Sequence, residues 1–202
     1  MNVMKVSKGL AVAALLSASS LASAHEAGDW LFRIGGSNVD PKSNNSPLVS
    51  VDDGASATFN FTYMYTDNLA VEVLAAWPFK HDISLVGGPK VGSTKHLPPT
   101  VSLQYHFMPD ATFQPYVGFG VNSTMFFSEK TTGPLQGANL DLDDSWGLAG
   151  EVGADLMLGD KWFLNLNFRY VDIDTKAKVN GDSLGTVSID PYVYGAHVGL
   201  RF

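Results

Sequence analysis

Six ionisable side chains fall on the polar positions of stretches in which apolar residues alternate with small or polar ones. They are Arg33, Glu72, Glu151, Asp155, Arg169 and Arg201. Three are cations and three are anions, so all six can be paired internally. Pairing is the expected chemistry because a buried charge without a partner is costly. A proton relay or a pore for charged solutes is the alternative use of the same residues.

Histidine and serine offer a second kind of chemistry. His106 and His197 lie on the same polar series, and Ser102 is close to the first of them. A lipid-modifying enzyme needs a nucleophile and a base near the membrane surface. The sequence shows no set of serine, histidine and acid, so no catalytic residue is predicted and the chain is not expected to be an enzyme.

Metal ligation has weak support. His25 and Glu26 are adjacent and do not make a ligand set, so a flexible chain end is expected there. His81 and His96 fall in one expected loop and are expected to be solvated. Cysteine is absent, which excludes disulfides and thiolate sites. No metal and no cofactor are therefore predicted.

These side chains must be positioned by strands, because apolar residues recur with a period of two. In residues 162–170 every even-numbered residue is apolar, whereas the odd-numbered ones include Asn165, Asn167 and Arg169. Eight such apolar series occur: Trp30 to Ile34, Phe59 to Tyr65, Leu69 to Trp77, Val101 to Phe107, Val117 to Met125, Trp146 to Leu158, Trp162 to Tyr170 and Tyr192 to Phe202. They predict eight strands of about ten residues or a little more, which is the span of a tilted strand that crosses a membrane.

The connections alternate between short and long. Residues 66–68, 108–112 and 159–160 are tight turns rich in turn-forming residues. The long connections are rich in Gly, Pro, Asn, Asp and Ser and are expected to be four extracellular loops: residues 39–56, 79–98, 128–144 and 176–188. This alternation predicts an all-β fold, an eight-stranded antiparallel up-and-down transmembrane β-barrel with its short turns in the periplasm.

The apolar face could point to lipid or, as in a soluble lipocalin-type barrel, to an internal ligand. A solvated exterior would be rich in Lys, Glu and Asp. The second face is instead mostly small or neutral, as in Thr58, Asn60 and Thr62. The tryptophans stand at strand ends, where an aromatic girdle meets the bilayer surfaces. The apolar face is therefore expected to contact outer-membrane lipid, and the narrow interior favours paired charges over a relay or pore.

The first residues are typical of a secretory signal peptide. Lys5 and Lys8 precede a short apolar run, and small residues at 22–24 suit cleavage. The predicted division is residues 1–24 as signal peptide and residues 25–202 as barrel. The net charge of −7 argues against a nucleic-acid partner, which would reward clustered Lys and Arg.

The chain resembles the OmpW family of outer membrane proteins of Gram-negative bacteria. The matching stretches are HEAGD at residues 25–29, FTYMYTDNLAVEVLAAWPFKH from 61, KHLPPT from 95, FQPYVGFGVNSTMFF from 113, DSWGLAGEVGADLML from 144, YVDIDTKA from 170 and DPYVYGAHVGLRF from 190. The resemblance implies a narrow porin-like channel for passive uptake of small hydrophobic molecules. It also implies lateral exit through the barrel wall.

The resemblance suggests roles for four further residues. Pro98 and Pro99 match prolines that the family associates with a side opening, and proline cannot donate to a strand ladder. Leu74 matches a leucine proposed to constrict the tunnel. The family's aromatic partner of that leucine is replaced here by Arg169, which can reach Glu72, Glu151 or Asp155 and close the lumen.

Phe202 resembles the C-terminal aromatic by which the barrel-assembly machinery recognises bacterial barrels. A structural or receptor barrel with a plugged lumen, whose extracellular loops bind partners, remains the alternative function.

Overall fold

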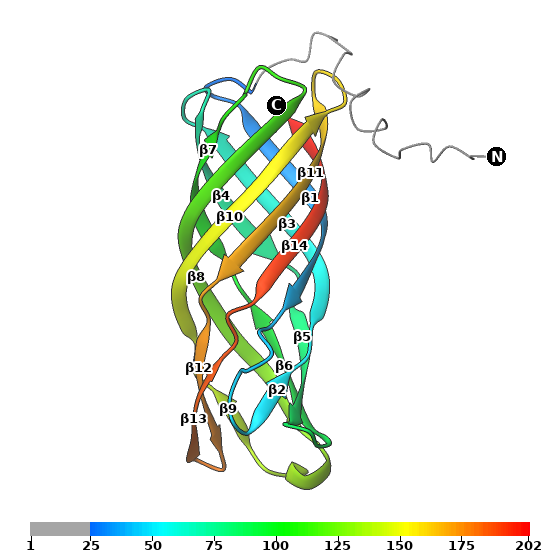
Figure 1. Ribbon diagram of the computed structural model, residues 1–202, viewed down its shortest axis with the longest axis vertical. Coiled ribbons are helices and arrows are strands. Elements are labelled where there is room, and N and C mark those ends of the chain that lie inside the picture. Colours follow the sequence, from blue (N-terminus) through cyan, green and yellow to red (C-terminus); the bar gives the residue numbers. More distant parts are fainter. Residues whose placement is uncertain (1–24) are drawn as a thin grey trace, which may run out of the picture.

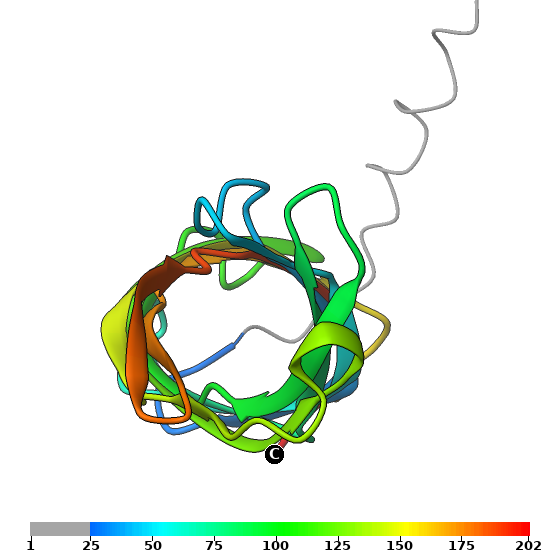
Figure 2. The ribbon, with the colours of Figure 1, turned by 90° about the horizontal axis from the view of Figure 1, so that it is seen from below.

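The computed structural model describes residues 25–202, so the predicted signal peptide, residues 1–24, lies outside the described part of the chain. Eight antiparallel strands form the wall of a barrel: β1 (Trp30–Asp40), β3 (Gly54–Met64), β4 (Leu69–Ala76), β7 (Thr100–His106), β8 (Phe113–Thr131), β10 (Ser145–Met157), β11 (Trp162–Val171) and β14 (Tyr192–Arg201). Pairing between β8 and β10 closes the sheet, and Figure 2 shows the resulting ring. The predicted fold is confirmed.

Within residues 25–202 no helix is long and apolar enough to cross a membrane.

The barrel is prolonged at one end by shorter elements. These are β2 (Val49–Val51), β5 (Phe79–Leu85), β6 (Lys90–Leu97), β9 (Leu140–Leu142), β12 (Asp174–Val179), β13 (Asp182–Ser188) and the short helix η2 (Gly133–Leu135). They gather at the lower end of Figure 1, opposite the short turns and the C-terminus. We call this region the extension. By the usual orientation of such barrels it faces outward from the cell.

The four long connections that were predicted as extracellular loops contain short strands. β5 and β6 form a hairpin, and β6 pairs with the C-terminal end of β8, so the wall continues into the extension. β12 pairs with both β13 and β9 in a second, three-stranded sheet. Glycine, serine and aspartate are frequent in these segments, and their turn-forming character hid the period-two pattern that remains beneath it.

The side chains have the predicted orientation. Leu166 is 67% exposed and Phe119 is 61% exposed, whereas Asn60 and Gln104 are fully buried. A soluble protein has the opposite arrangement, with apolar side chains inside. The distribution therefore confirms that the apolar face contacts lipid and that the polar face fills the lumen.

Candidate functional site

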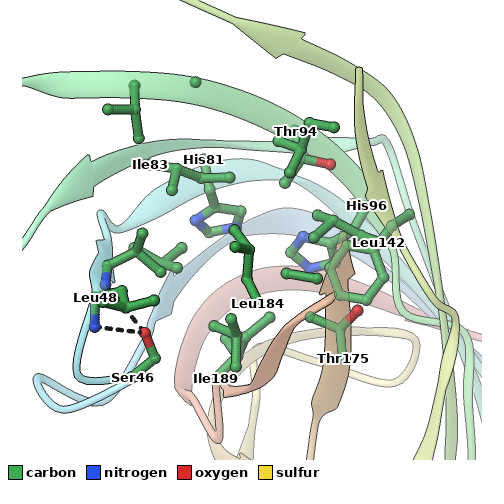
Figure 3. A pocket seen from close by; sticks show the side chains of 18 of the residues that line it. Ser46, Leu48, His81, Ile83, Thr94, His96, Leu142, Thr175, Leu184 and Ile189 are labelled. Carbon is green, nitrogen blue, oxygen red and sulfur yellow. Dashed lines mark hydrogen bonds between the residues drawn. The ribbon is translucent and has the colours of Figure 1, made fainter. Parts of the chain in front are cut away.

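The extension encloses an apolar cavity of about 860 Å³, counting the part that is open to solvent. Its walls come from segments far apart in sequence, and Figure 3 shows Leu48 and Ile83 on one side and Leu142 on the other, with Ile189 between them at the bottom of the view. No Asp, Glu, Lys or Arg lines it. We call this space the outer cavity. Its lining suits an uncharged, largely hydrophobic ligand.

A second cavity, of about 420 Å³ when the part open to solvent is counted, lies next to the outer cavity on the side of the barrel lumen. His96 and Ile173 line both spaces. Leu74, Pro98 and Arg169 also line the second one, which we call the inner cavity. The structure thus brings Leu74, Arg169 and the first of the two prolines to one place, although they are far apart in the sequence.

The strand ladder is interrupted beside the inner cavity. Pairing of β4 with β7 ends at Leu74 opposite Thr100, and pairing of β5 with β6 begins at Phe79 opposite His96. In the described chain, no ladder pair joins residues 75–78 to residues 97–99 between these points. The second of these segments contains Pro98 and Pro99, which have no N–H to donate.

Across the sheet, the described hydrogen bonds to the two prolines come from β8, and within their own segment the Thr100 hydroxyl donates to the Pro98 carbonyl over 3.1 Å. The Asn122 Nδ2 atom donates to the carbonyls of Pro98 (3.1 Å) and Pro99 (3.2 Å). The Ser123 backbone N–H also donates to the Pro99 carbonyl, over 3.0 Å. Both donors belong to β8, so the interruption lies on the opposite side, toward β4. We call it the wall break.

The floor of the inner cavity is a chain of buried ion pairs. An Nη2 atom of Arg169 lies 2.6 Å from Glu72 and 2.8 Å from Glu151. Glu72 also pairs with Arg33 over 3.0 Å, and Arg33 pairs with Asp155 over 2.7 Å. Five of the six predicted lumen charges are therefore joined, and Arg169 reaches two of its three predicted partners but not Asp155.

Arg201, the sixth charge, lies apart from this chain. It is 3.6 Å from Asp29 at the end with the short turns. Phe202 follows it, and its backbone exchanges two hydrogen bonds with Trp30 while its ring is exposed.

Large side chains fill the lumen between the ion pairs and the end with the short turns. Tyr116 and Phe163 are buried there and flank the Arg33 guanidinium at 5.4 and 5.5 Å from their ring centroids. A Cβ atom at Gly153 would collide with the Tyr116 ring, and one at Gly199 with the Phe163 ring. Glycine at these two positions allows the rings to occupy the centre of the barrel. Together these contacts make a plug.

His25 is part of the plug, so the prediction of a flexible chain end was wrong. Its side chain is fully buried, and Nε2 lies 3.3 Å from the Asp155 carboxylate. Its ring also packs edge-on against His106 and Phe163. His25, His106 and Asp155 present ligand atoms within 4.8 Å of one another. Because Asp155 is bound to Arg33, a cation there would be repelled by the guanidinium.

The remaining candidate residues bond to neutral partners. His106 lies 3.3 Å from the Gln104 side chain, and His197 lies 2.7 Å from the Thr58 hydroxyl. Ser102 is buried on the same face. Gln104 in turn donates to the Glu151 carboxylate over 2.9 Å, so the hydrogen bonds of His106 lead on to the buried ion pairs.

His81 and His96 were wrongly predicted to be solvated. Both are buried, at 2% and 3% exposure, and both line the outer cavity. They lie on β5 and β6, where alternate residues face inward, so the continued wall explains their burial. The alternation of His81 with Ile83 is the sequence signal that could have located the first of them.

Comparison with known proteins gives consistent results. Residues 26–202 match the model of the OmpW family. The chain is 42% identical to outer membrane protein W of Vibrio cholerae, over 96% of this chain and 97% of the relative. It is 41% identical to outer membrane protein W of Escherichia coli, over 96% of each chain.

A solved structure agrees in fold. The crystal structure of the outer membrane protein OprG from Pseudomonas aeruginosa matches with a TM-score of 0.80 at 37% identity, covering 90% of this chain and 99% of that one. The protein therefore belongs to the OmpW family and is an eight-stranded β-barrel of the bacterial outer membrane.

Proposed function

We propose that the protein is a passive channel that accepts small hydrophobic molecules at the outer cavity and releases them sideways into the bilayer. The observation that carries this proposal is the adjacency of the outer and inner cavities, which share His96 and Ile173 as lining residues, with Pro98 in the lining of the inner one. Burial of apolar surface lowers the free energy by about 25 cal/mol for each Å² removed from water. An apolar molecule is therefore stabilised when it binds in an apolar cavity.

The exit is proposed at the wall break because the straight path is closed. The ion pairs of Arg169 form the floor, and the plug lies beneath them. A hydrophobic molecule that displaced these charges would leave them unpaired, at high cost. Separating β4 from residues 97–99 breaks no ladder pair. In this scheme Leu74 lines the constriction beside the exit.

A more distant relative supports the choice of cargo. The chain is 26% identical to a Pseudomonas aeruginosa protein named for a dibenzothiophene metabolism operon. Dibenzothiophene is an uncharged aromatic molecule, which is the class of ligand that the outer cavity suits.

The second candidate function is a receptor or structural barrel whose extension binds a partner. The plug and the floor favour it, because they close the lumen without requiring any transport. Under either function, we propose that residues 1–24 are cleaved on export and that Phe202 marks the chain for the barrel-assembly machinery.

The test compares outer-membrane vesicles that contain or lack the protein. Their lipopolysaccharide leaflet slows apolar molecules, so the fluorescence of added N-phenyl-1-naphthylamine reports its arrival in the bilayer. The channel gives a faster rise in fluorescence while a hydrophilic dye stays excluded. Equal rates with and without the protein would contradict transport and favour the receptor.

A further inference from the structure

Two histidines are built into the wall of the outer cavity. The rings of His81 and His96 stack with centroids 4.8 Å apart and an angle of 20° between their planes. The Phe79 ring stacks on the His96 ring, with 5.4 Å between the ring centroids. Figure 3 shows both imidazoles among the aliphatic side chains that line the space. The packing fixes both rings, so their nitrogen atoms have defined positions.

The bonding of His81 determines what its free nitrogen can do. Nδ1 lies 2.6 Å from the backbone carbonyl of Asp52. A carbonyl only accepts, so Nδ1 carries the proton, and Nε2 of a neutral ring is then an acceptor. Nε2 is buried and has no hydrogen-bond partner in the described chain. Burial lowers the pKa of His81, which favours the neutral ring.

His96 presents a second free nitrogen. Its Nε2 atom is also buried without a partner among the described residues. Burial and the neighbouring His81 lower the pKa of His96 to about 3, so this ring too is neutral at physiological pH. Buried polar atoms are nearly always hydrogen-bonded in native proteins, and leaving one unpaired costs about 1 to 3 kcal/mol.

The other polar groups of the outer cavity are already engaged. The hydroxyls of Thr94, Thr124 and Thr175 donate to the oxygens of Lys95, Asn122 and Asp143 respectively. The Ser46 hydroxyl accepts from two backbone N–H groups. Of the side-chain atoms that line the cavity, the Nε2 atoms of His81 and His96 are the ones buried without any hydrogen-bond partner among the described residues.

We propose that the outer cavity selects hydrophobic molecules that carry one uncharged hydroxyl group, such as phenols and alkanols. The ligand's O–H donates to Nε2 of His81, and His96 bonds the same oxygen. This inference rests on the proposed function and narrows its class of cargo. Carboxylates and metal ions are disfavoured because no charged side chain lines the cavity to balance them.

The test uses the full mature chain in lipid nanodiscs and three probes that differ only in one substituent. Naphthalene has no polar group, 2-methoxynaphthalene has an oxygen without a proton, and 2-naphthol has the hydroxyl. Affinities are measured by equilibrium dialysis and corrected for partition into protein-free nanodiscs. We expect 2-naphthol to bind about tenfold tighter than 2-methoxynaphthalene, the ratio that about 1.4 kcal/mol gives.

Three variants assign this preference to the histidines. His81→Phe and His96→Phe keep the stacked rings, and we expect the ratio to fall toward one while naphthalene binding stays within about twofold. His81→Asn, which keeps an N–H near the Asp52 carbonyl, repeats the test if the first variant loses naphthalene as well. Thr94→Val is the matched control, since its hydroxyl is already engaged, and it keeps the wild-type ratio.

A wild-type ratio near one, or a ratio that survives loss of both imidazoles, would overturn this inference while leaving the channel intact. Failure of all three probes to bind the wild-type protein would instead refute the proposed function itself. The two failures are therefore distinguishable.

Discussion

Arg169 on β11 reaches across the lumen to Glu72 on β4, with 2.6 Å between Nη2 and Oε1. The two residues are 97 positions apart in the sequence. This contact lies between the apolar cavities on the side of the extension and the plug on the side of the short turns. In the proposed function, it is the point at which a hydrophobic solute turns toward the wall.

Replacing Arg169 by glutamine is expected to destabilise the barrel. The change removes a partner of both Glu72 and Glu151, which are buried. Breaking a buried ion pair costs about 3 kcal/mol or more, and urea unfolding of the protein in detergent measures the loss. Lys42→Gln, in a partly exposed pair with Asp190, is the control with a much smaller expected effect. Equal losses would show that the floor has no special energetic role.

Conductance separates the floor from the plug. Arg169→Gln is expected to give no steady ion current in planar bilayers, because the pair of Arg33 with Asp155 and the packed rings remain below it. A stable open pore in this variant would mean that Arg169 alone blocks ions in the lumen, and this would contradict the assignment of a plug.

Replacing Pro98 and Pro99 by alanine is expected to slow delivery of N-phenyl-1-naphthylamine to the bilayer. Alanine restores two N–H donors that can bond toward β4, and one such bond is worth about 1 kcal/mol. A stabilisation of this size makes the open wall about fivefold rarer. Pro109→Ala, in a turn at the opposite end of the barrel, controls for the loss of proline itself. An unchanged rate in the double variant would argue against exit at the wall break.

A charge on the outer surface tests the orientation of the strands. Leu166 is exposed in the middle of β11, and arginine at the bilayer midplane costs about 2 to 4 kcal/mol. We therefore expect Leu166→Arg to lower the unfolding free energy in lipid by that amount. Val86→Arg, at an exposed apolar residue in the turn between β5 and β6, is expected to be nearly neutral. Similar effects of the two substitutions would mean that Leu166 does not face lipid.

Acid is expected to weaken the protein through His96, which lies in the extension outside the membrane. Burial holds its pKa near 3 in the folded protein, against 6.5 for an ordinary histidine. Stability from the neutral ring is thus complete above about pH 6.5 and is lost progressively as pH falls toward 3. As pH is lowered from 7 to 4, the urea midpoint of the wild type should therefore fall further than the urea midpoint of His96→Phe. A constant difference would show that the wild-type ring is hydrated.

The sequence predicted the wall well and the lumen only in part. Period-two alternation locates strands and separates their faces, because each residue's direction is a local property. Arg169 pairs with Glu72 and Glu151 and not with Asp155. Which carboxylates it can reach depends on how the strands are staggered around the ring, and no single segment encodes that stagger. His25 was missed for a related reason, since its burial depends on a barrel mouth built by distant strands.

Photo-crosslinking tests the central claim, sideways release above a closed lumen, most directly. A small apolar diazirine is added to the protein in lipid, and the modified residues are identified by mass spectrometry. The account predicts adducts on inward-facing residues of the two cavities, such as Phe126 and Ile173, and beside the wall break at Leu74 and Pro98. Phe163 and Met64, which are buried within the plug and cannot be reached from lipid, should remain unmodified. Adducts on those two residues, with none at the wall break, would show that the solute passes straight through the barrel.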